Sequence, residues 1–220
     1  LQKRGYPQWD VTGEADEAPD ELEQALFAMR DRLFAIVKPE TPLSFDEKLD
    51  RLHLACCAMQ SEYDDLLFPV EGEDAPFSWS KMFWSEACLK ALAERLAALE
   101  INKDSWRTLL GEVHARIPEL LARRADFLAY YKDKLYEYDE LLEYFLYRHF
   151  MKTLADDVLI EKVQFALIGA SFIQLLDIYR WLTDGELTHW EQICICKAYS
   201  REIEYNEDNT EAVARFLTMD

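Results

Sequence analysis

The stretch VLIEKVQFALIGASFIQLLDIYRWL, residues 158–182, decides the fold of this chain. Between Phe165 and Leu176 it is apolar on every side of a helical wheel, and a helix that is apolar all round has to be surrounded. A membrane span needs roughly 18 to 20 apolar residues, whereas charges at Glu161 and Asp177 bracket a shorter run here. The sequence therefore predicts a buried central helix surrounded by protein, and no membrane partner.

Small residues lie in the middle of this segment, at Gly169, Ala170 and Ser171. A glycine inside a helix costs about 1 kcal/mol relative to alanine, so a packing reason is expected for it. We expect another helix to cross closely at this point.

Composition and charge limit the partners of the chain. Its 220 residues carry a formal net charge of -19, and half of them are hydrophobic. Nucleic-acid binding depends on clustered Lys and Arg that neutralise phosphates, so we expect no nucleic-acid partner. A basic protein or peptide is the more natural charged partner, although an acidic balance also serves solubility alone.

The ends of the chain and its cysteines indicate where it works. No apolar signal segment opens the sequence and no anchor closes it, which predicts a cytoplasmic protein. The five cysteines are odd in number, and Cys56 with Cys57, or Cys194 with Cys196, are too closely spaced in helical patterns for disulfides. We therefore expect reduced thiols. Because the chain opens on Leu1 rather than Met, we also expect further sequence upstream.

Periodicity and capping patterns predict helices after an extended lead-in at residues 1–18. Capping boxes begin two of them, at Ser44 and Thr188, where a hydroxyl and a glutamate three residues later satisfy free backbone N–H groups. Residues 68–79, rich in proline, glycine and acids, predict a loop. We expect a helix from residue 104 to end or kink at Pro118, unless this proline opens the next helix. The other expected helices span residues 19–38, 45–63, 80–100, 119–154, 158–182, 188–205 and 210–217.

No alternating strand pattern, sequence repeat or low-complexity tract is found in the sequence. The prediction is an all-α fold, a single multi-helix bundle of seven to nine helices around the buried central helix. Residues 19–220 are expected to form a single helical domain.

Few residues carry a recognisable chemical motif. The sequence has no glycine-rich phosphate loop, nucleophile elbow, metalloprotease His pair or dinucleotide fingerprint. His53 and Cys57 lie four residues apart, a spacing that two metal ligands can use, but no second pair accompanies them. Cys194 and Cys196 lie roughly 200° apart around a helix and could not share one ion. The sequence therefore predicts no metal site.

The densest polar cluster on a predicted buried helix is YSREIEYN, residues 199–206. With Ile193 taken as facing the core, Glu204 lies within about 20° of the core direction. Arg201 lies near 80° and Glu202 at about 180°, so Glu202 is expected to point away. Two interpretations stay open, an intrahelical i,i+3 ion pair between Arg201 and Glu204 or a charged site that lines a groove.

The same cluster carries a family resemblance. YSREIEYNEDN, preceded by LLEYFLYRHF and KVQFALIGASFIQLL, resembles the C-terminal helical region of the flagellin lysine-N-methylase family. The stretch LFAMRDRLFAIVKPETPLSFDEKLDRL resembles an earlier segment of that family, so the likeness covers about residues 20 to 210. It implies a bacterial protein-lysine N-methyltransferase that acts on flagellin with S-adenosylmethionine as methyl donor.

The chain departs from this family at two points. The resemblance implies an N-terminal cluster of cysteines with metal or iron–sulfur ligand character, which this sequence lacks unless an upstream segment supplies it. Tyr205 stands where the family's motif often has histidine. We therefore interpret the chain as the helical portion of such a protein and expect it to be inactive on its own.

Two functions are compatible with these features. In the first, the chain is the helical domain of a protein-lysine methylase, whose carboxylates and tyrosine rings attract an ammonium group. The candidate catalytic residues are then Arg201, Glu202 and Glu204. The candidate substrate-binding residues are Tyr144, Tyr147, Tyr199 and Tyr205. In the second, the chain is a non-catalytic acidic helical module that binds a basic protein or peptide segment. An upstream cysteine cluster would favour the enzyme.

Overall fold

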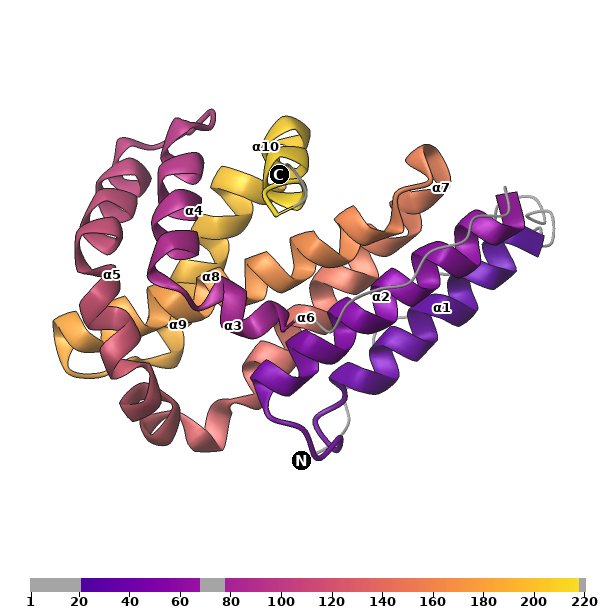
Figure 1. Cartoon of the computed structure of the whole chain (residues 1–220). Helices are drawn as coiled ribbons and strands as arrows, with labels where there is room; N and C mark the ends of the chain where they lie inside the picture. Colours follow the sequence, from indigo (N-terminus) through magenta and orange to yellow (C-terminus); the bar gives the residue numbers. More distant parts are fainter. Residues whose placement is uncertain (1–20, 68–77, 218–220) are drawn as a thin grey trace, which may run out of the picture.

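The computed structural model describes residues 21–67 and 78–217, and these form helices joined by short connections (Figure 1). The predicted lead-in and most of the predicted loop at residues 68–79 lie outside the described residues. Within the described ranges no strand occurs and eight helices have eight residues or more, so the all-α prediction is confirmed. These are α1 (Glu21–Val37), α2 (Phe45–Leu67), α4 (Glu86–Ala98), α5 (Asp104–Tyr130), α6 (Tyr136–His149), α8 (Leu159–Asp184), α9 (His189–Tyr199) and α10 (Glu207–Ala214).

Helix α8 runs through the middle of the molecule (Figure 1). The α1–α2 pair lies toward one of its ends, and α4, α5 and α9 lie toward the other. Every residue from Val163 to Ile178 is buried, and α2, α5, α6, α9 and α10 all pack against the helix. Among the described residues α8 alone is long and apolar enough to cross a membrane, but 89% of its apolar window is buried inside the protein. The predicted buried central helix is confirmed.

Polar side chains on α8 are directed at particular neighbours. Gln164 accepts a hydrogen bond from the indole N–H of Trp79 at 2.8 Å, in the short helix α3 (Trp79–Phe83). The Gln174 carbonyl oxygen accepts from Arg124 of α5 at 3.1 Å. Because a buried polar group is costly without a partner, these hydrogen bonds favour one arrangement of the surrounding helices.

Gly169 of α8 faces Phe145 of α6 and Tyr199 at the end of α9. A Cβ atom at this position would be 3.1 Å from Cε2 of Phe145 and 3.2 Å from the hydroxyl of Tyr199. These separations are tighter than ordinary van der Waals contact. The close approach expected at the small residues of the central helix is confirmed, and its physical reason is the two aromatic rings.

Capping features predicted from the sequence appear in the structure. The Thr188 hydroxyl accepts from the Glu191 N–H at 3.2 Å, and the Glu191 carboxylate accepts from the Thr188 N–H at 2.8 Å. Ser44 and Glu47 form the same reciprocal pair before α2. Gly185 ends α8 with a φ of 82°, in the left-handed region that glycine adopts without strain.

Two predicted helix boundaries are wrong. The helix expected at residues 80–100 is two helices, because Ser85 lies in extended backbone and its hydroxyl accepts from the Cys88 N–H at the start of α4. Pro118 neither ends a helix nor opens one, since α5 continues through it to Tyr130, and the alternative of a kink at Pro118 stays a prediction. Pro118 has no backbone N–H, so the carbonyl four residues earlier loses its helical hydrogen bond. Because Pro118 is exposed, this carbonyl lies on the solvent side of α5.

The run predicted as continuous helix over residues 119–154 is also interrupted. Tight 3-10 turns follow α5 and α6, at Lys132–Lys134 and Phe150–Lys152. The short helix α7 (Thr153–Asp156) then ends at Asp157, which has a φ of 61°. Local helix propensity did not predict these turns. They change the direction of the chain between the helices that pack against α8.

Candidate functional site

A wide turn of helix carries the predicted polar cluster. Helix α9 ends at Tyr199 and continues as a π-helical turn over Ser200–Glu204, in which the Tyr205 N–H donates to the Ser200 carbonyl at 2.9 Å. A π turn holds more residues than an α turn and so changes which side chains face inward. Glu202, Ile203 and Glu204 are all buried as a result.

The Glu204 carboxylate is the centre of the site. Its Oε1 accepts from the Tyr144 hydroxyl at 2.9 Å and lies 2.6 Å from Nε of Arg148 and 3.3 Å from Nε2 of His149. Its Oε2 accepts from the Ser200 hydroxyl at 2.7 Å. Burial alone would raise the pKa of Glu204, but these hydrogen bonds and the Arg148 charge outweigh it and hold the pKa below its usual value. The group is therefore a buried, ionised carboxylate.

Two predicted tyrosines accompany Glu204 at the surface, and a third is buried nearby. Tyr144 is partly exposed and its hydroxyl donates to the carboxylate, and Tyr205 is 70% exposed with the Arg148 guanidinium 5.8 Å from its ring centroid. Tyr199 is fully buried against Phe145, and its hydroxyl has no hydrogen-bond partner among the described residues. Burial and the Glu204 charge raise the Tyr199 pKa well above its usual value, so its hydroxyl is neutral. Tyr144 and Tyr205 thus border the site, whereas Tyr199 belongs to the core.

The orientation expected for Glu202 is wrong. Its side chain is buried, with Oε1 accepting from Nε of Arg201 at 2.7 Å and Oε2 accepting from the Asn102 N–H at 2.7 Å. Gln192 and Tyr199, not Ile193, are the buried residues of α9, and the π turn rotates the following residues further. Arg201 therefore pairs with Glu202 instead of Glu204. Through hydrogen bonds with Asn102 and Lys103, the two residues hold the connection that leads into α5.

Tyr147 does not take part in this cluster of contacts. It is 68% exposed on α6, and its ring lies 5.8 Å from the guanidinium of Arg30 in α1. In contrast, Arg148, His149 and Ser200 touch Glu204 and were missed by sequence reasoning. Their only signal in the sequence was their position inside the blocks LLEYFLYRHF and YSREIEYNEDN.

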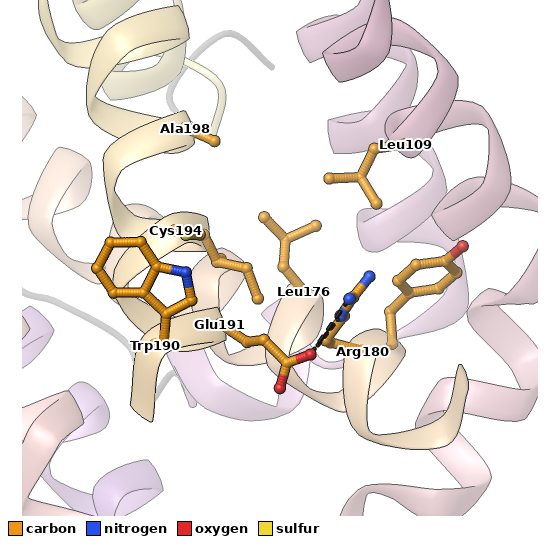
Figure 2. A pocket seen from close by; sticks show the side chains of 9 residues that line it. Leu109, Leu176, Arg180, Trp190, Glu191, Cys194 and Ala198 are labelled. Atoms are coloured by element: carbon orange, nitrogen blue, oxygen red, sulfur yellow. Dashed lines mark hydrogen bonds and ion pairs between the residues drawn. The ribbon is translucent and has the colours of Figure 1, made fainter. Parts of the chain in front are cut away.

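A separate groove lies between α5, α8 and α9 (Figure 2). It has a volume of about 480 Å³, an apolar interior that includes Leu109 and Leu176, and the exposed indole of Trp190 on its α9 side. Arg180 crosses the groove to the Glu191 carboxylate at 3.2 Å. Three helices distant in sequence form it, so the sequence contained no local pattern that would reveal it.

The groove does not fit S-adenosylmethionine. Ribose hydroxyls are commonly held by a free carboxylate, but both oxygens of Glu191 are already engaged, one by Thr188 and one by Arg180. The rest of the lining is largely apolar. As to metals, the described residues hold no group of three or more His, Cys, Asp or Glu side chains arranged around an ion, and the metal-free state stays a prediction.

The fold and the site define an all-α domain in which a buried carboxylate pairs with a half-exposed cationic side chain and with an exposed tyrosine. A family model of the FliB lysine N-methylase C-terminal domain matches residues 59–220, which is more than half of the chain. The chain therefore belongs to the FliB lysine N-methylase C-terminal domain family. The matched range leaves out the stretch at residues 26–52 that resembles an earlier segment of the methylase. No curated protein and no solved structure that we compared matches the chain.

Proposed function

We propose that this chain is the helical, substrate-binding domain of a bacterial protein-lysine N-methyltransferase. Its substrate would be a lysine-bearing segment of a flagellin-like protein, bound in the cytoplasm. The observation that carries the proposal is the Glu204 carboxylate, which is buried and ionised, accepts from the Tyr144 hydroxyl and already pairs with a cation that lies near the Tyr205 ring. Family membership and the net charge of -19 support it independently.

The chemistry of this site suits a lysine side chain. A carboxylate within contact distance of an ammonium contributes a charge-assisted hydrogen bond, worth about 1.5 to 3 kcal/mol. An aromatic face adds about 0.5 to 2 kcal/mol, depending on how far the cation is desolvated. Glu204 and the Tyr205 ring would therefore bind and orient the ammonium, and Tyr144 would keep the carboxylate in place through its hydroxyl.

We assign no donor site to the described residues. In this proposal S-adenosylmethionine is held by another part of the full-length enzyme, and the present chain binds the protein substrate. A cysteine cluster in an upstream segment would belong to that other part as well. The 220-residue chain alone is then expected to bind the substrate without methylating it.

Full-length enzyme co-expressed with flagellin tests this function. Glu204→Gln removes the negative charge with little change in shape, and we expect at least a tenfold loss of lysine methylation by mass spectrometry. Tyr136→Ala is the matched control, because Tyr136 is an exposed tyrosine on the same helix α6 with no contact to Glu204 among the described residues. Circular dichroism verifies that both variants fold.

The outcomes separate the two functions left open by the sequence. Unchanged methylation in Glu204→Gln would contradict the substrate-site proposal. Binding of a basic flagellin segment by the wild-type full-length protein without any mass shift would instead favour the non-catalytic acidic module. Arg201→Ala is expected to act mainly on stability, because Arg201 contacts Glu202 and not Glu204.

A further inference from the structure

We propose that Arg148 is a resident competitor that closes the lysine-binding site, and that a substrate lysine enters by displacing it. This inference rests on the proposed function, since it concerns the regulation of the same site. Arg148 lies in the last turn of α6, and its guanidinium occupies the position in which a substrate ammonium would meet Glu204.

The exposures of the side chains show which group is outermost. The Glu204 side chain is 0% exposed, whereas the Arg148 side chain is 45% exposed and Tyr205 beside it is 70% exposed. The guanidinium therefore lies between the carboxylate and the solvent. A cation arriving from solution meets Tyr205 and Arg148 before it reaches Glu204.

Arg148 is the partner of Glu204 that can leave at least cost. His149 and Ser200 are buried or half-buried, and their contacts with the carboxylate are part of the packed core. Arg148 is half-exposed, so water can solvate its guanidinium after it swings outward. His149, Ser200 and Tyr144 would still bind the carboxylate, which keeps it available to another cation.

A lysine is a suitable replacement for this arginine. Its ammonium is a compact charge with three donors on a flexible stem, so it can reach Oε1 of Glu204 without the planar geometry that a guanidinium needs. The Tyr205 ring face, now 5.8 Å from the Arg148 guanidinium, can accept either cation. The site therefore takes primary alkylammonium groups of a protein chain.

A tethered competitor lowers the apparent affinity for any cation from solution. Two groups joined by a short stretch of chain meet at an effective concentration of about millimolar. The apparent dissociation constant of a free lysine ligand equals its intrinsic value divided by the fraction of molecules in which Arg148 has left Glu204, the open fraction. If the open state makes up roughly a tenth of the molecules, removal of the guanidinium tightens binding about tenfold. Arg148 would thus raise the apparent Kd of every lysine ligand by the same factor, so that at low concentration only segments with further contacts would occupy the site.

The variant Arg148→Met tests this inference, because it keeps an unbranched stem over Tyr205 and removes the charge and its donors. We expect the Kd of Nα-acetyl-lysine amide, measured by calorimetry on the full-length protein, to fall about tenfold, and KM for flagellin to fall with kcat unchanged. Arg32→Met is the matched control, since it removes a surface arginine that pairs with Glu62 away from the site. Arg148→Gln replaces Arg148→Met if the latter fails to fold.

Glu204→Gln separates failure of this inference from failure of the proposed function. Loss of probe binding in Glu204→Gln, together with unchanged or weaker binding in both Arg148 variants, would overturn the competitor role and leave the substrate site standing. Wild-type probe binding and methylation in Glu204→Gln would overturn the substrate site itself. Tighter binding in the Arg148 variants and its loss in Glu204→Gln are the expected pair of results.

Discussion

Asp177 is a buried carboxylic acid on the apolar central helix α8. One of its oxygens accepts from the Tyr138 hydroxyl at 2.8 Å, and the buried Gln192 side chain of α9 lies near the same carboxyl group. Burial raises the pKa of Asp177 to about 8, and the nearby Glu137 charge adds to this, although hydrogen bonds from Tyr138 and Gln192 lower it. The side chain is therefore largely protonated in the folded protein at neutral pH.

The pKa of Asp177 makes stability depend on pH. An unfolded Asp loses its proton near pH 4, whereas folded Asp177 keeps it up to about pH 8, so the stabilisation is complete below pH 4 and is lost as pH rises through 8. Asp177→Asn removes this loss. We expect the free energy of unfolding of Asp177→Asn, relative to that of the wild type, to be about 3 kcal/mol higher at pH 8.5 than at pH 5.5.

Denaturant unfolding at pH 5.5 and pH 8.5 measures this difference in stability. Both values lie above the pI of about 4.6, where solubility is lowest. Parallel pH profiles for the wild type and Asp177→Asn would contradict a protonated Asp177.

Three helices are joined by a single lysine. Lys48 of α2 is 2% exposed, and its ammonium donates to the Val37 carbonyl at the end of α1 and to Asp139 of α6 at 2.8 Å. Burial raises the pKa of Asp139 and Lys48 lowers it, with a net rise. The ammonium therefore caps one helix while it pairs with another, which ties the α1–α2 pair to α6.

Lys48→Met tests this junction. We expect it to lower the free energy of unfolding by about 3 to 5 kcal/mol, because it leaves Asp139 buried without its cation. The double variant Lys48→Met/Asp139→Leu should recover much of the loss, since no buried charge remains. Arg32→Met, which breaks an exposed pair, should cost below about 1 kcal/mol. If Lys48→Met lowered the free energy of unfolding no more than Arg32→Met does, Lys48 would not be buried in solution.

The whole molecule is arranged around α8, which has protein on all sides along residues 163–178. Helices from both halves of the chain cover it, and their buried residues form one hydrophobic cluster from Leu26 to Ala214. An amide in such a helix opens to solvent only when several neighbours separate together. The stability of α8 is therefore expected to equal that of the global fold.

Hydrogen exchange measures this property. We expect the amides of residues 165–176 to exchange slowest in the protein, at rates set by global unfolding. Amides in α1, which packs against the rest on one face only, should exchange faster through local opening. Fast exchange in the middle of α8 would contradict its central position.

Local patterns in the sequence were sufficient for the all-α fold, the burial of α8, the end of that helix at Gly185 and the capping box at Thr188. Each depends on residues within a few positions of one another, where helical period and backbone geometry act directly. The cluster around Glu204 was predicted in part, since Tyr144, Tyr205 and the carboxylate itself were among the candidate residues.

The partners of these residues could not be inferred from the chain alone. Arg148 lies 56 positions before Glu204, and Lys48 lies 91 positions before Asp139. Nothing in the period of α9 indicated that a π turn would bring Glu202 inside. Such contacts depend on how helices pack and on where a turn absorbs an extra residue, and both are settled by the sum of many side-chain fits across the core.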